Sequence, residues 1–386
     1  MSANLSRDAS VTNDSRPNNF NPASFIRPNV VDLKPYTPIL PFEVLSAQLG
    51  REPGDIIKLD ANENPYGPSP LVAEALAEAP FLHIYPDPEC RELRQALADY
   101  TGLDAGYLVV GLGADELIDL VMRLFIEPGD RIVNCPPTFG MYAFDADINA
   151  AAQVSVWRRE DFSIDVEKIE ALFASSNGSQ PDPPKLIFVT SPNNPDGSLL
   201  GDDELKRLLA LPAITILDEA YIEFCGDSRM QWVKQYPNLI VLRTFSKWAG
   251  LAGMRVGYGA LPPGIITHLW KIKQPYNVPV ASQLAAQVSL ADRAWLRNNV
   301  DKIIAARDRF YAQLKEVNWL TPYPSHTNFI LCQVVAPRRA VEIKQQLAEQ
   351  GILIRYYNSP GLTDCVRFSI GTPAQMSKVI NVLEQL

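Results

Sequence analysis

The sequence predicts an α/β protein with a large domain, built on a mostly parallel sheet flanked by helices, and a smaller α+β domain. Five short apolar segments each end in small or polar residues, and helical stretches separate several of them. Apolar strands that alternate with helices are typical of parallel sheets buried on both faces. With 386 residues, of which 47% are hydrophobic and 20% charged, the chain is long enough for two domains and a large core.

The five predicted strands of the large domain lead into the polar residues that a ligand site needs, because ligands of such sheets bind beyond the carboxyl ends of the strands. Helical periodicity predicts helices at 89–100 and 117–126. The strands are expected at 108–110, 131–133, 186–189, 214–217 and 239–242.

The order of the domains follows from composition. We expect a flexible polar tail at 1–34, a segment at 35–64 that joins the small domain, the large domain at 65–274 and the small domain at 275–386. The tail lacks the apolar core of a signal peptide, and its acidic residues argue against an organelle transit peptide. Residues 60–68 are rich in Asn, Pro and Gly and predict a loop. The small domain is expected to contain helices at 283–290 and 294–314 and strands at 328–334, 352–357 and 365–370.

Composition also excludes several classes of function. The net charge of -9 is dispersed, so there is no basic stripe for nucleic acid, and no apolar run reaches the ~18 residues of a membrane span. The three histidines lack metal-ligand spacing, so no metal is expected. Five cysteines without a CxxC pair suit the reduced thiols of a cytoplasmic protein. The expected partners are small molecules or a second copy of the chain.

The predicted chemistry centres on Lys247, in the sequence Thr244-Phe245-Ser246-Lys247-Trp248 directly after the last predicted strand of the large domain. Burying an unpaired ammonium costs several kcal/mol or lowers its pKa. A desolvated amine can instead form a Schiff base with an aldehyde, and pyridoxal 5'-phosphate is the usual aldehyde. A solvated loop lysine is the alternative for an isolated Ser-Lys pair.

The sequence Gly111-Leu112-Gly113, between a strand and a helix, offers free N–H groups at the positive end of a helix dipole. Such a turn suits a phosphate, although a tight turn without any ligand remains open. The same letters could begin the fold of a nicotinamide-dependent dehydrogenase. Glu116 replaces the third glycine of that motif, however, and Asp130 precedes the second strand rather than ending it.

Four further residues suit a pyridine cofactor. Asp218 ends a buried strand, where it could cap a helix or keep a pyridine nitrogen protonated. Tyr221 and the amide of Asn194 can donate to a phenolate oxygen, and Phe139 can stack on a ring face or belong to the core.

In combination these motifs resemble the fold-type I pyridoxal-phosphate-dependent aminotransferases, and within them the histidinol-phosphate aminotransferase branch. The resemblance extends from about Tyr36 to the C-terminus. It departs from the family where Asp196-Gly197 replaces the commoner Thr-Gly and where Phe139 replaces a frequent Tyr. It rests on the motifs Asn62-Glu63-Asn64-Pro65-Tyr66-Gly67, Gly113-Ala114-Asp115-Glu116, Pro137-Thr138-Phe139-Gly140-Met141-Tyr142, Ser191-Pro192-Asn193-Asn194-Pro195, Asp218-Glu219-Ala220-Tyr221, Ser246-Lys247 and Arg255-Val256-Gly257-Tyr258.

The resemblance implies a role for each candidate residue. Lys247 is implied to carry the cofactor as an internal aldimine and then to move a proton between the substrate carbon and the cofactor. Asp218 is implied to hold the ring nitrogen, and Asn194 and Tyr221 to contact the phenolate oxygen. The resemblance also implies a homodimer with shared active sites. The implied phosphate ligands are the amides of Ala114 and Asp115, the side chains of Ser246 and Arg255, and Tyr66 from the neighbouring subunit.

For the substrate, the family places arginines at the positions of Arg355 and Arg367, assisted by Tyr36 and Asn194. Two planar guanidinium groups suit a phosphate better than a single carboxylate. We therefore expect the amino group to pass between histidinol phosphate and 2-oxoglutarate, with glutamate as the other amino acid, in histidine biosynthesis. The alternatives are an aromatic amino-acid aminotransferase, a phosphothreonine decarboxylase, and a non-catalytic protein with the same fold.

Overall fold

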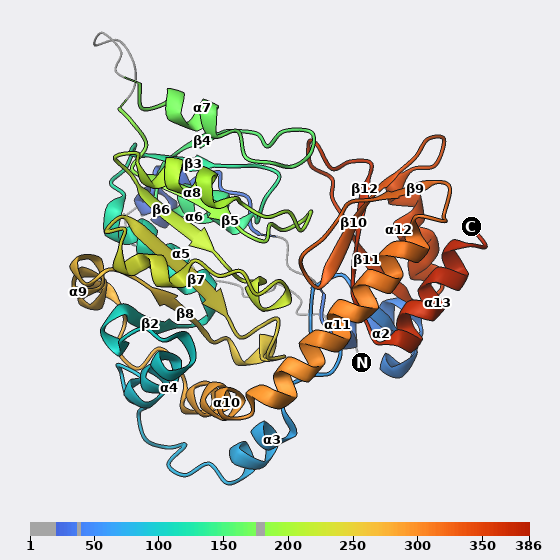
Figure 1. The fold of residues 1–386 in the computed structure, drawn as a ribbon, viewed down its shortest axis with the longest axis horizontal. Coiled ribbons are helices and arrows are strands. Elements are labelled where there is room, and N and C mark those ends of the chain that lie inside the picture. The colour runs from blue at the N-terminus through green and yellow to red at the C-terminus, as the bar shows by residue number, and fades with distance from the viewer. Residues whose placement is uncertain (1–20, 37–39, 175–181) are drawn as a thin grey trace, which may run out of the picture.

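Two β-sheets organise the molecule, one of seven strands and one of five (Figure 1). The structure is a computed structural model that describes residues 21–36, 40–174 and 182–386. The strand order is β2-β8-β7-β6-β5-β3-β4 in the larger sheet and β1-β11-β12-β10-β9 in the smaller one. The predicted fold class is confirmed, because helices flank a larger, mostly parallel sheet and a second α+β unit follows it.

The seven-stranded sheet contains all five strands predicted for it, and β5, β6 and β7 pair in parallel as expected. Two further strands, β4 and β8, were not predicted, because one is short and largely polar and the other is Gly-Tyr-Gly-Ala, with no β-branched residue. Strand β8 is antiparallel to β2 and β7. The bounds are β2 (Leu108–Gly111), β3 (Arg131–Asn134), β4 (Ala152–Ser155), β5 (Leu186–Thr190), β6 (Ile214–Asp218), β7 (Leu239–Thr244) and β8 (Gly257–Ala260).

Successive residues of a strand point to opposite faces of the sheet. Because the strands are apolar on both faces, helices cover both. In β5, Ile187 packs into the apolar cluster that contains residues of α4, α8 and α10, whereas Phe188 packs into the cluster of α5, α6 and α9. The helices are α3 (Pro70–Ala77), α4 (Arg91–Thr101), α5 (Gly113–Phe125), α6 (Met141–Ile148), α7 (Val166–Ala171), α8 (Asp202–Leu209), α9 (Pro263–Ile272) and α10 (Val280–Ala291). Helix α5 thus begins at Gly113 rather than at the predicted residue 117.

The five-stranded sheet combines an N-terminal strand with C-terminal strands, since β1 pairs in parallel with β11. The long helix α11 packs against β9, β10 and α13 (Figure 1). The division of the chain into domains at the residues predicted above stays a prediction. Helix α10, however, was expected in the small domain and instead packs against α3 and α4 of the larger unit. The elements are α2 (Phe42–Leu49), β1 (Ile57–Leu59), α11 (Arg293–Leu314), β9 (Leu320–Pro322), β10 (Phe329–Val334), α12 (Ala340–Glu349), β11 (Ile352–Tyr356), β12 (Cys365–Ser369) and α13 (Pro373–Leu383).

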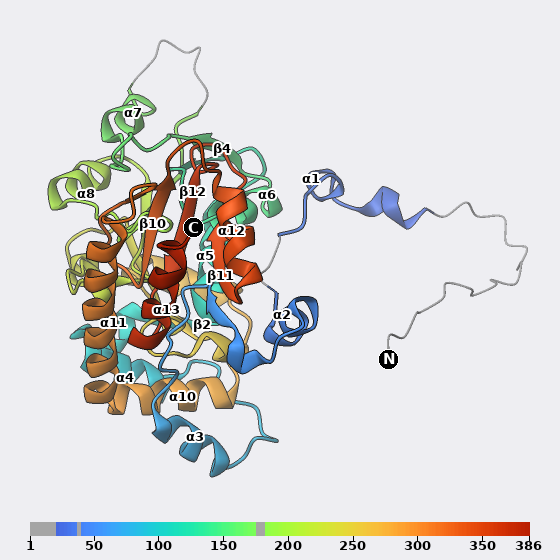
Figure 2. The same cartoon turned by 90° about the vertical axis from the view of Figure 1, so that its right-hand side faces the viewer.

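The N-terminal stretch has local structure that the sequence did not predict. A 3-10 helix, η1 (Pro22–Phe25), precedes the short helix α1 (Pro28–Val31), which contacts the C-terminal end of α6 (Figure 2). Arg27 Nη2 donates to the carbonyl of Ile148 at 2.8 Å, and Asn29 Nδ2 donates to that of Asp147 at 2.7 Å. These side chains satisfy helix-end carbonyls that have no partner within α6. The other residues of the predicted tail, 1–20, lie outside the described residues.

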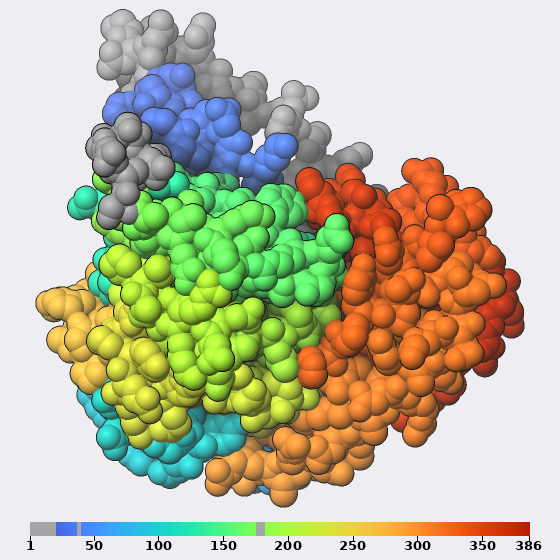
Figure 3. Space-filling view, turned by 45° about the horizontal axis from the view of Figure 1, so that its top comes forward, coloured from blue at the N-terminus to red at the C-terminus, as the bar shows by residue number. Residues whose placement is uncertain are grey.

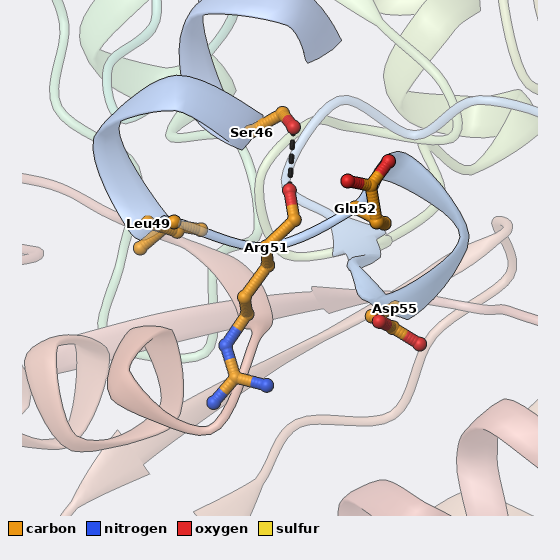
Figure 4. A pocket seen from close by; sticks show the side chains of 6 residues that line it. Ser46, Leu49, Arg51, Glu52 and Asp55 are labelled. Carbon is orange, nitrogen blue, oxygen red and sulfur yellow. Dashed lines mark hydrogen bonds between the residues drawn. The ribbon is translucent and has the colours of Figure 1, made fainter.

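The surface formed by the larger sheet and its helices meets that of the C-terminal unit along one seam (Figure 3). An open pocket elsewhere, at the end of α2, is lined by Ser46, Leu49, Arg51, Glu52 and Asp55 and contains none of the candidate residues (Figure 4). No helix in the described ranges is long and apolar enough to cross a membrane. Within the same ranges, no group of His, Cys, Asp and Glu is arranged to hold a metal ion.

Candidate active site

Lys247 lies just beyond the carboxyl end of β7, where its amine is desolvated. Its Nζ donates to the carbonyl of Ala61 at 3.1 Å and lies 6.0 Å from the centre of the Tyr221 ring. Burial, and to a lesser extent the positive charge of Arg367, lower the pKa of Lys247 to about 8, against smaller opposing effects of Glu63 and Asp115. A substantial fraction of this amine is therefore neutral near pH 8, as a nucleophile or general base requires.

Asp218 is the last residue of β6 and is 3% exposed. Its Oδ2 accepts from the hydroxyl of Tyr142 at 2.6 Å, and its Oδ1 accepts from the N–H of Ala220 at 2.9 Å. Burial raises the pKa of Asp218 to about 6, although both hydrogen bonds act to lower it. A cationic ring nitrogen would stabilise this carboxylate, because opposite charges at close range favour ionisation.

Tyr221 and Asn194 have partners that the sequence did not assign to them. The buried hydroxyl of Tyr221 accepts from Asn62 Nδ2 at 3.0 Å, and burial raises the pKa of Tyr221 to about 12, so the phenol keeps its proton. Asn194 Oδ1 accepts from Arg367 Nη1 at 2.5 Å. This contact leaves the amide N–H groups of Asn194 without a hydrogen bond to any described residue, which is compatible with the predicted donation to a cofactor.

The predicted phosphate seat surrounds the first turn of α5. Gly113 has φ +77°, and a Cβ there would stand 2.8 Å from Arg255 Nη2. A Cβ on Gly257 would stand 2.6 Å from the amide nitrogen of Ala114, so only glycine allows β8 to approach the helix start so closely. Arg255 Nη2 pairs with Asp115 Oδ2 at 2.7 Å across the same turn.

Ser246 and Glu116 complete the surroundings of this turn. Ser246 Oγ accepts from Thr244 Oγ1 at 2.9 Å, which leaves the proton of Ser246 free to be donated. Glu116 Oε2 accepts from the N–H of Leu112 at 2.7 Å and from Asn277 Nδ2 at 2.6 Å. The N–H of Leu112 is therefore already bonded to Glu116 and is not available to a pyrophosphate. This argues against the dinucleotide-binding alternative.

Arg367 and Arg355 lie opposite each other on β12 and β11, as Cα partners in an antiparallel pair. Arg367 is 5% exposed, and its Nη2 donates to the carbonyl of Asp60 at 2.9 Å. Its guanidinium lies 5.0 Å from the centre of the Phe329 ring. Like charges directly opposite each other destabilise a sheet, and neither arginine forms an ion pair with a carboxylate of the described residues. The pair is therefore suited to an anionic ligand.

Three predicted residues have other contacts in this chain, and their predicted roles stay predictions. Tyr36 is 46% exposed and packs edge-on against Phe144, with ring centres 6.0 Å apart. Burial and, to a lesser extent, the nearby Tyr36 raise the pKa of Tyr357, which lies beside the two arginines. The ring of Tyr66 lies 5.2 Å from Lys302 Nζ. Its predicted contact with the phosphate seat of the neighbouring subunit stays a prediction. Phe139 packs edge-on against Tyr142 at 5.7 Å, and its predicted stacking on a cofactor stays a prediction.

Two polar side chains of the site were not singled out from the sequence, although both lie in quoted motifs. Tyr142 orients the carboxylate of Asp218, and a tyrosine one helical turn after a Pro-Thr-Phe loop was the available signal. Asn62 is 2% exposed and has φ +56°, a conformation that Asn tolerates better than most residues. Its Oδ1 also accepts from Ser369 Oγ at 2.9 Å, so Asn62 connects Tyr221 to the smaller sheet.

The fold and the site together define a class of protein. Residues 54–383 match the family described as aminotransferase class I and II, and the chain belongs to that family.

The similarity extends to particular relatives. The chain is 53% identical over 363 residues to histidinol-phosphate aminotransferase 1, chloroplastic, of Arabidopsis thaliana, covering 94% of this chain and 86% of that protein. It is 48% identical to the histidinol-phosphate aminotransferase of Roseiflexus castenholzii, covering 94% and 98% of the two chains. Among solved structures, the histidinol-phosphate aminotransferase of Sinorhizobium meliloti in complex with pyridoxal-5'-phosphate superposes with a TM-score of 0.83 at 29% identity, covering 94% and 97%.

Proposed function

We propose that this chain is an aminotransferase that passes the amino group between histidinol phosphate and 2-oxoglutarate with pyridoxal 5'-phosphate as cofactor. The observation that carries the substrate assignment is the opposed pair Arg355 and Arg367, which no described carboxylate neutralises. Two guanidinium groups on one side of a site suit a phosphate, since each presents a planar fork of donors. The similarity to enzymes named for this substrate supports the same assignment.

The donor set fits the proposed cofactor. Lys247 supplies an amine whose pKa is lowered to about 8, and Asp218 supplies a buried carboxylate at the end of the neighbouring strand. The first turn of α5 offers amides to an anion, and the two glycines beside it, Gly113 and Gly257, keep that space open to Arg255 and the helix start. An aldehyde with a basic ring nitrogen and a phosphate matches all three features.

Each protein group then has a defined task. The cofactor, when bound, supplies an electron sink for the carbon that exchanges its amino group. Asp218 holds a positive charge at the ring nitrogen, Tyr221 and Asn194 donate hydrogen bonds at the edge of the ring, and Lys247 holds or moves the proton of the reacting carbon. Arg355 and Arg367 orient the substrate by its anionic end.

A substrate panel tests this proposal. The purified holoenzyme is assayed with 2-oxoglutarate and, in turn, histidinol phosphate, phenylalanine and phosphothreonine, and with phosphothreonine carbon dioxide is also measured. We expect kcat/KM to be highest for histidinol phosphate. A preference for phenylalanine would establish the aromatic amino-acid aminotransferase instead, and release of carbon dioxide from phosphothreonine would establish the decarboxylase. A protein that gains no activity from added pyridoxal phosphate would refute the cofactor.

We also propose that the enzyme works as a homodimer with shared active sites. Large apolar side chains are exposed between α3 and α4, with Phe81 at 64%, Leu82 at 62% and Tyr85 at 80%. Tyr85 packs against Tyr276 with ring centres 4.9 Å apart, so the exposed surface extends to the start of α10. A contiguous apolar surface on a soluble enzyme supports coverage by another copy.

Subunit mixing tests the sharing of sites. Lys247→Ala and Tyr66→Ala subunits are purified separately, unfolded together and refolded as a mixture. If Tyr66 serves the neighbouring site, a mixed dimer contains one site with both native side chains, and activity above that of either parent returns. Activity no greater than the sum of the parents would show that Tyr66 acts within its own subunit or not at all.

A cytoplasmic location is likewise proposed. All five cysteines belong to the described residues and none is in a disulfide, which supports a reducing compartment. The Arabidopsis relative is named chloroplastic, so cell fractionation with an antibody to the chain is the direct test.

A further inference from the structure

We propose that Tyr357 is a third donor to the anionic end of the substrate and makes the site prefer a phosphate over a carboxylate. The proposal rests on the proposed function, because it concerns the same anion site. No sequence motif singled out Tyr357, which directly follows the last residue of β11.

The ring of Tyr357 lies close to both arginines. The guanidinium carbons of Arg355 and Arg367 are each 5.7 Å from the centre of this ring. Residues two apart on a strand face the same side, and Arg355 is the cross-strand partner of Arg367. The three side chains therefore stand together on one face of the smaller sheet, with the aromatic ring close to two positive charges.

The hydroxyl of Tyr357 is buried and has no hydrogen-bond partner among the described residues. An unpaired buried hydroxyl is unfavourable, since it loses its hydrogen bonds to water. Burial raises the pKa of Tyr357, more than the two arginines lower it, so the phenol stays protonated and can donate near neutral pH. Arg367 Nε is also buried without a partner. The group that would satisfy these donors together is an anion with several oxygens.

This arrangement favours a phosphate over a carboxylate for a geometric reason. A carboxylate has two oxygens, which the two guanidinium groups can occupy. A phosphate monoester has three terminal oxygens, and the third is available to the hydroxyl of Tyr357. Loss of this hydroxyl should therefore weaken the binding of histidinol phosphate more than that of 2-oxoglutarate.

A purely structural role is the competing explanation. A ring close to two arginines can hold them in place by cation–π attraction without any help from its hydroxyl. Tyr357→Phe separates the two roles, because phenylalanine keeps the ring and removes only the donor. Tyr356→Phe is the matched control, since Tyr356 is the adjacent residue, points to the other face of the strand and packs against the main apolar cluster.

The experiment compares wild-type, Tyr357→Phe and Tyr356→Phe holoenzymes. For Tyr357→Phe we expect KM for histidinol phosphate to rise about tenfold, in line with the loss of one hydrogen bond to a charged group. We expect kcat and KM for 2-oxoglutarate to change less than about threefold. The inhibition constant of inorganic phosphate should rise with the first KM. The melting temperature should not fall, because the change removes an unpaired buried hydroxyl. Tyr356→Phe should match the wild type in every constant.

Two results would overturn the donor role: unchanged KM and phosphate inhibition in Tyr357→Phe, or equal losses for both substrates together with a lower melting temperature. A failure of the proposed function is recognised separately, as a wild-type holoenzyme that does not turn over histidinol phosphate. Binding of inorganic phosphate to the holoenzyme, measured directly by titration of the cofactor absorbance, does not depend on turnover and decides the role of Tyr357 even then.

Discussion

The site has two halves: a cofactor half around Lys247, Asp218 and Arg255, and a substrate half around Arg355 and Arg367. They hold their charged groups in different ways. In the cofactor half, each charged side chain has a polar partner: Asp218 accepts two hydrogen bonds, and Arg255 pairs with Asp115. In the substrate half, Arg355 and Arg367 face aromatic rings and each other, without a carboxylate partner in the described part of the chain. In the cofactor half, Arg255 is thus neutralised by Asp115 and Asp218 is held by two neutral donors, whereas the substrate half retains its positive charge for an incoming anion.

The difference has a structural origin. The cofactor half is built from β6, β7 and α5 of the seven-stranded unit, and the substrate half from β11 and β12 of the five-stranded unit. Asn194 and Asn62 connect the halves through hydrogen bonds to Arg367 and Ser369. Substitutions in the first half should therefore alter the chemistry with every substrate, and those in the second half should alter binding and substrate preference.

The largest effect is expected for Lys247→Ala. Removal of the amine should lower kcat by about 10⁴-fold with every substrate, because the proton of the reacting carbon loses its general base. Single-turnover absorbance measurements with each substrate check this. Lys185→Ala is the control, since Lys185 precedes β5 at the end of the sheet opposite the site and pairs with Asp130. Substantial residual activity, or an effect confined to one substrate, would contradict the role of Lys247.

Arg367→Lys should have the next largest effect, and mainly on KM. Lysine keeps the charge but cannot maintain the contacts to Asn194 and Asp60 together with a bidentate contact to a phosphate, so we expect KM for histidinol phosphate to rise about 10²-fold. Steady-state kinetics at saturating cofactor measure this. Arg338→Lys, which alters an arginine stacked on Trp319 at 4.8 Å, should leave KM unchanged. If kcat fell while KM stayed constant, the division between the two halves would be wrong.

Most of the fold could be predicted because apolar strands buried on both faces have a distinctive pattern. Strands β2, β3, β5, β6 and β7 were predicted from this pattern, and the polar residues that follow them were selected as the site. Strand β8 could not be predicted, because Gly257 and Gly259 are chosen for close approach to α5 and β7 rather than for strand propensity. The pairing of β1 with β11 joins residues almost 300 positions apart, and no local pattern specifies such a contact.

The sequence predicts the chemical groups of the site but not the hydrogen bonds between them. Lys247 and Asp218 were recognised from the motifs in combination, because each alone is at least as typical of a solvated loop lysine or a helix-capping aspartate. The hydrogen bonds of Asn62, Tyr142 and Tyr357 depend on tertiary packing, and each of these side chains would be unremarkable in an isolated segment. Sequence motifs therefore identify the chemical groups, whereas the contacts that tune them appear only in the folded chain.

The pH dependence of cofactor uptake should sharpen the description of the cofactor half. Burial disfavours the ammonium form of Lys247 and lowers its pKa to about 8, so the reactive neutral amine increases with pH up to that value. Below pH 8, the rate at which the apo-protein takes up pyridoxal phosphate should rise about tenfold per pH unit and then level off. Stopped-flow absorbance measures the rate. A rate that kept rising beyond pH 9, as for an ordinary lysine, would show that the amine is solvated.

The smallest effect is expected for Tyr142→Phe, which removes a donor to Asp218 without altering either charge of the cofactor half. The hydroxyl of Tyr142 donates to Asp218 Oδ2 and lies 2.8 Å from Thr190 Oγ1, so its loss should destabilise the fold by about 1 kcal/mol. Because this hydrogen bond lowers the pKa of Asp218, its removal should raise that pKa above about 6 and leave more of the carboxyl protonated near neutral pH. We expect kcat to fall a few-fold at pH 7 and to recover as the pH rises and Asp218 ionises. Tyr323→Phe, at a tyrosine packed edge-on against Phe162, is the control in the smaller unit. A loss that is the same at every pH would mean that Tyr142 only positions the carboxylate and does not tune its charge.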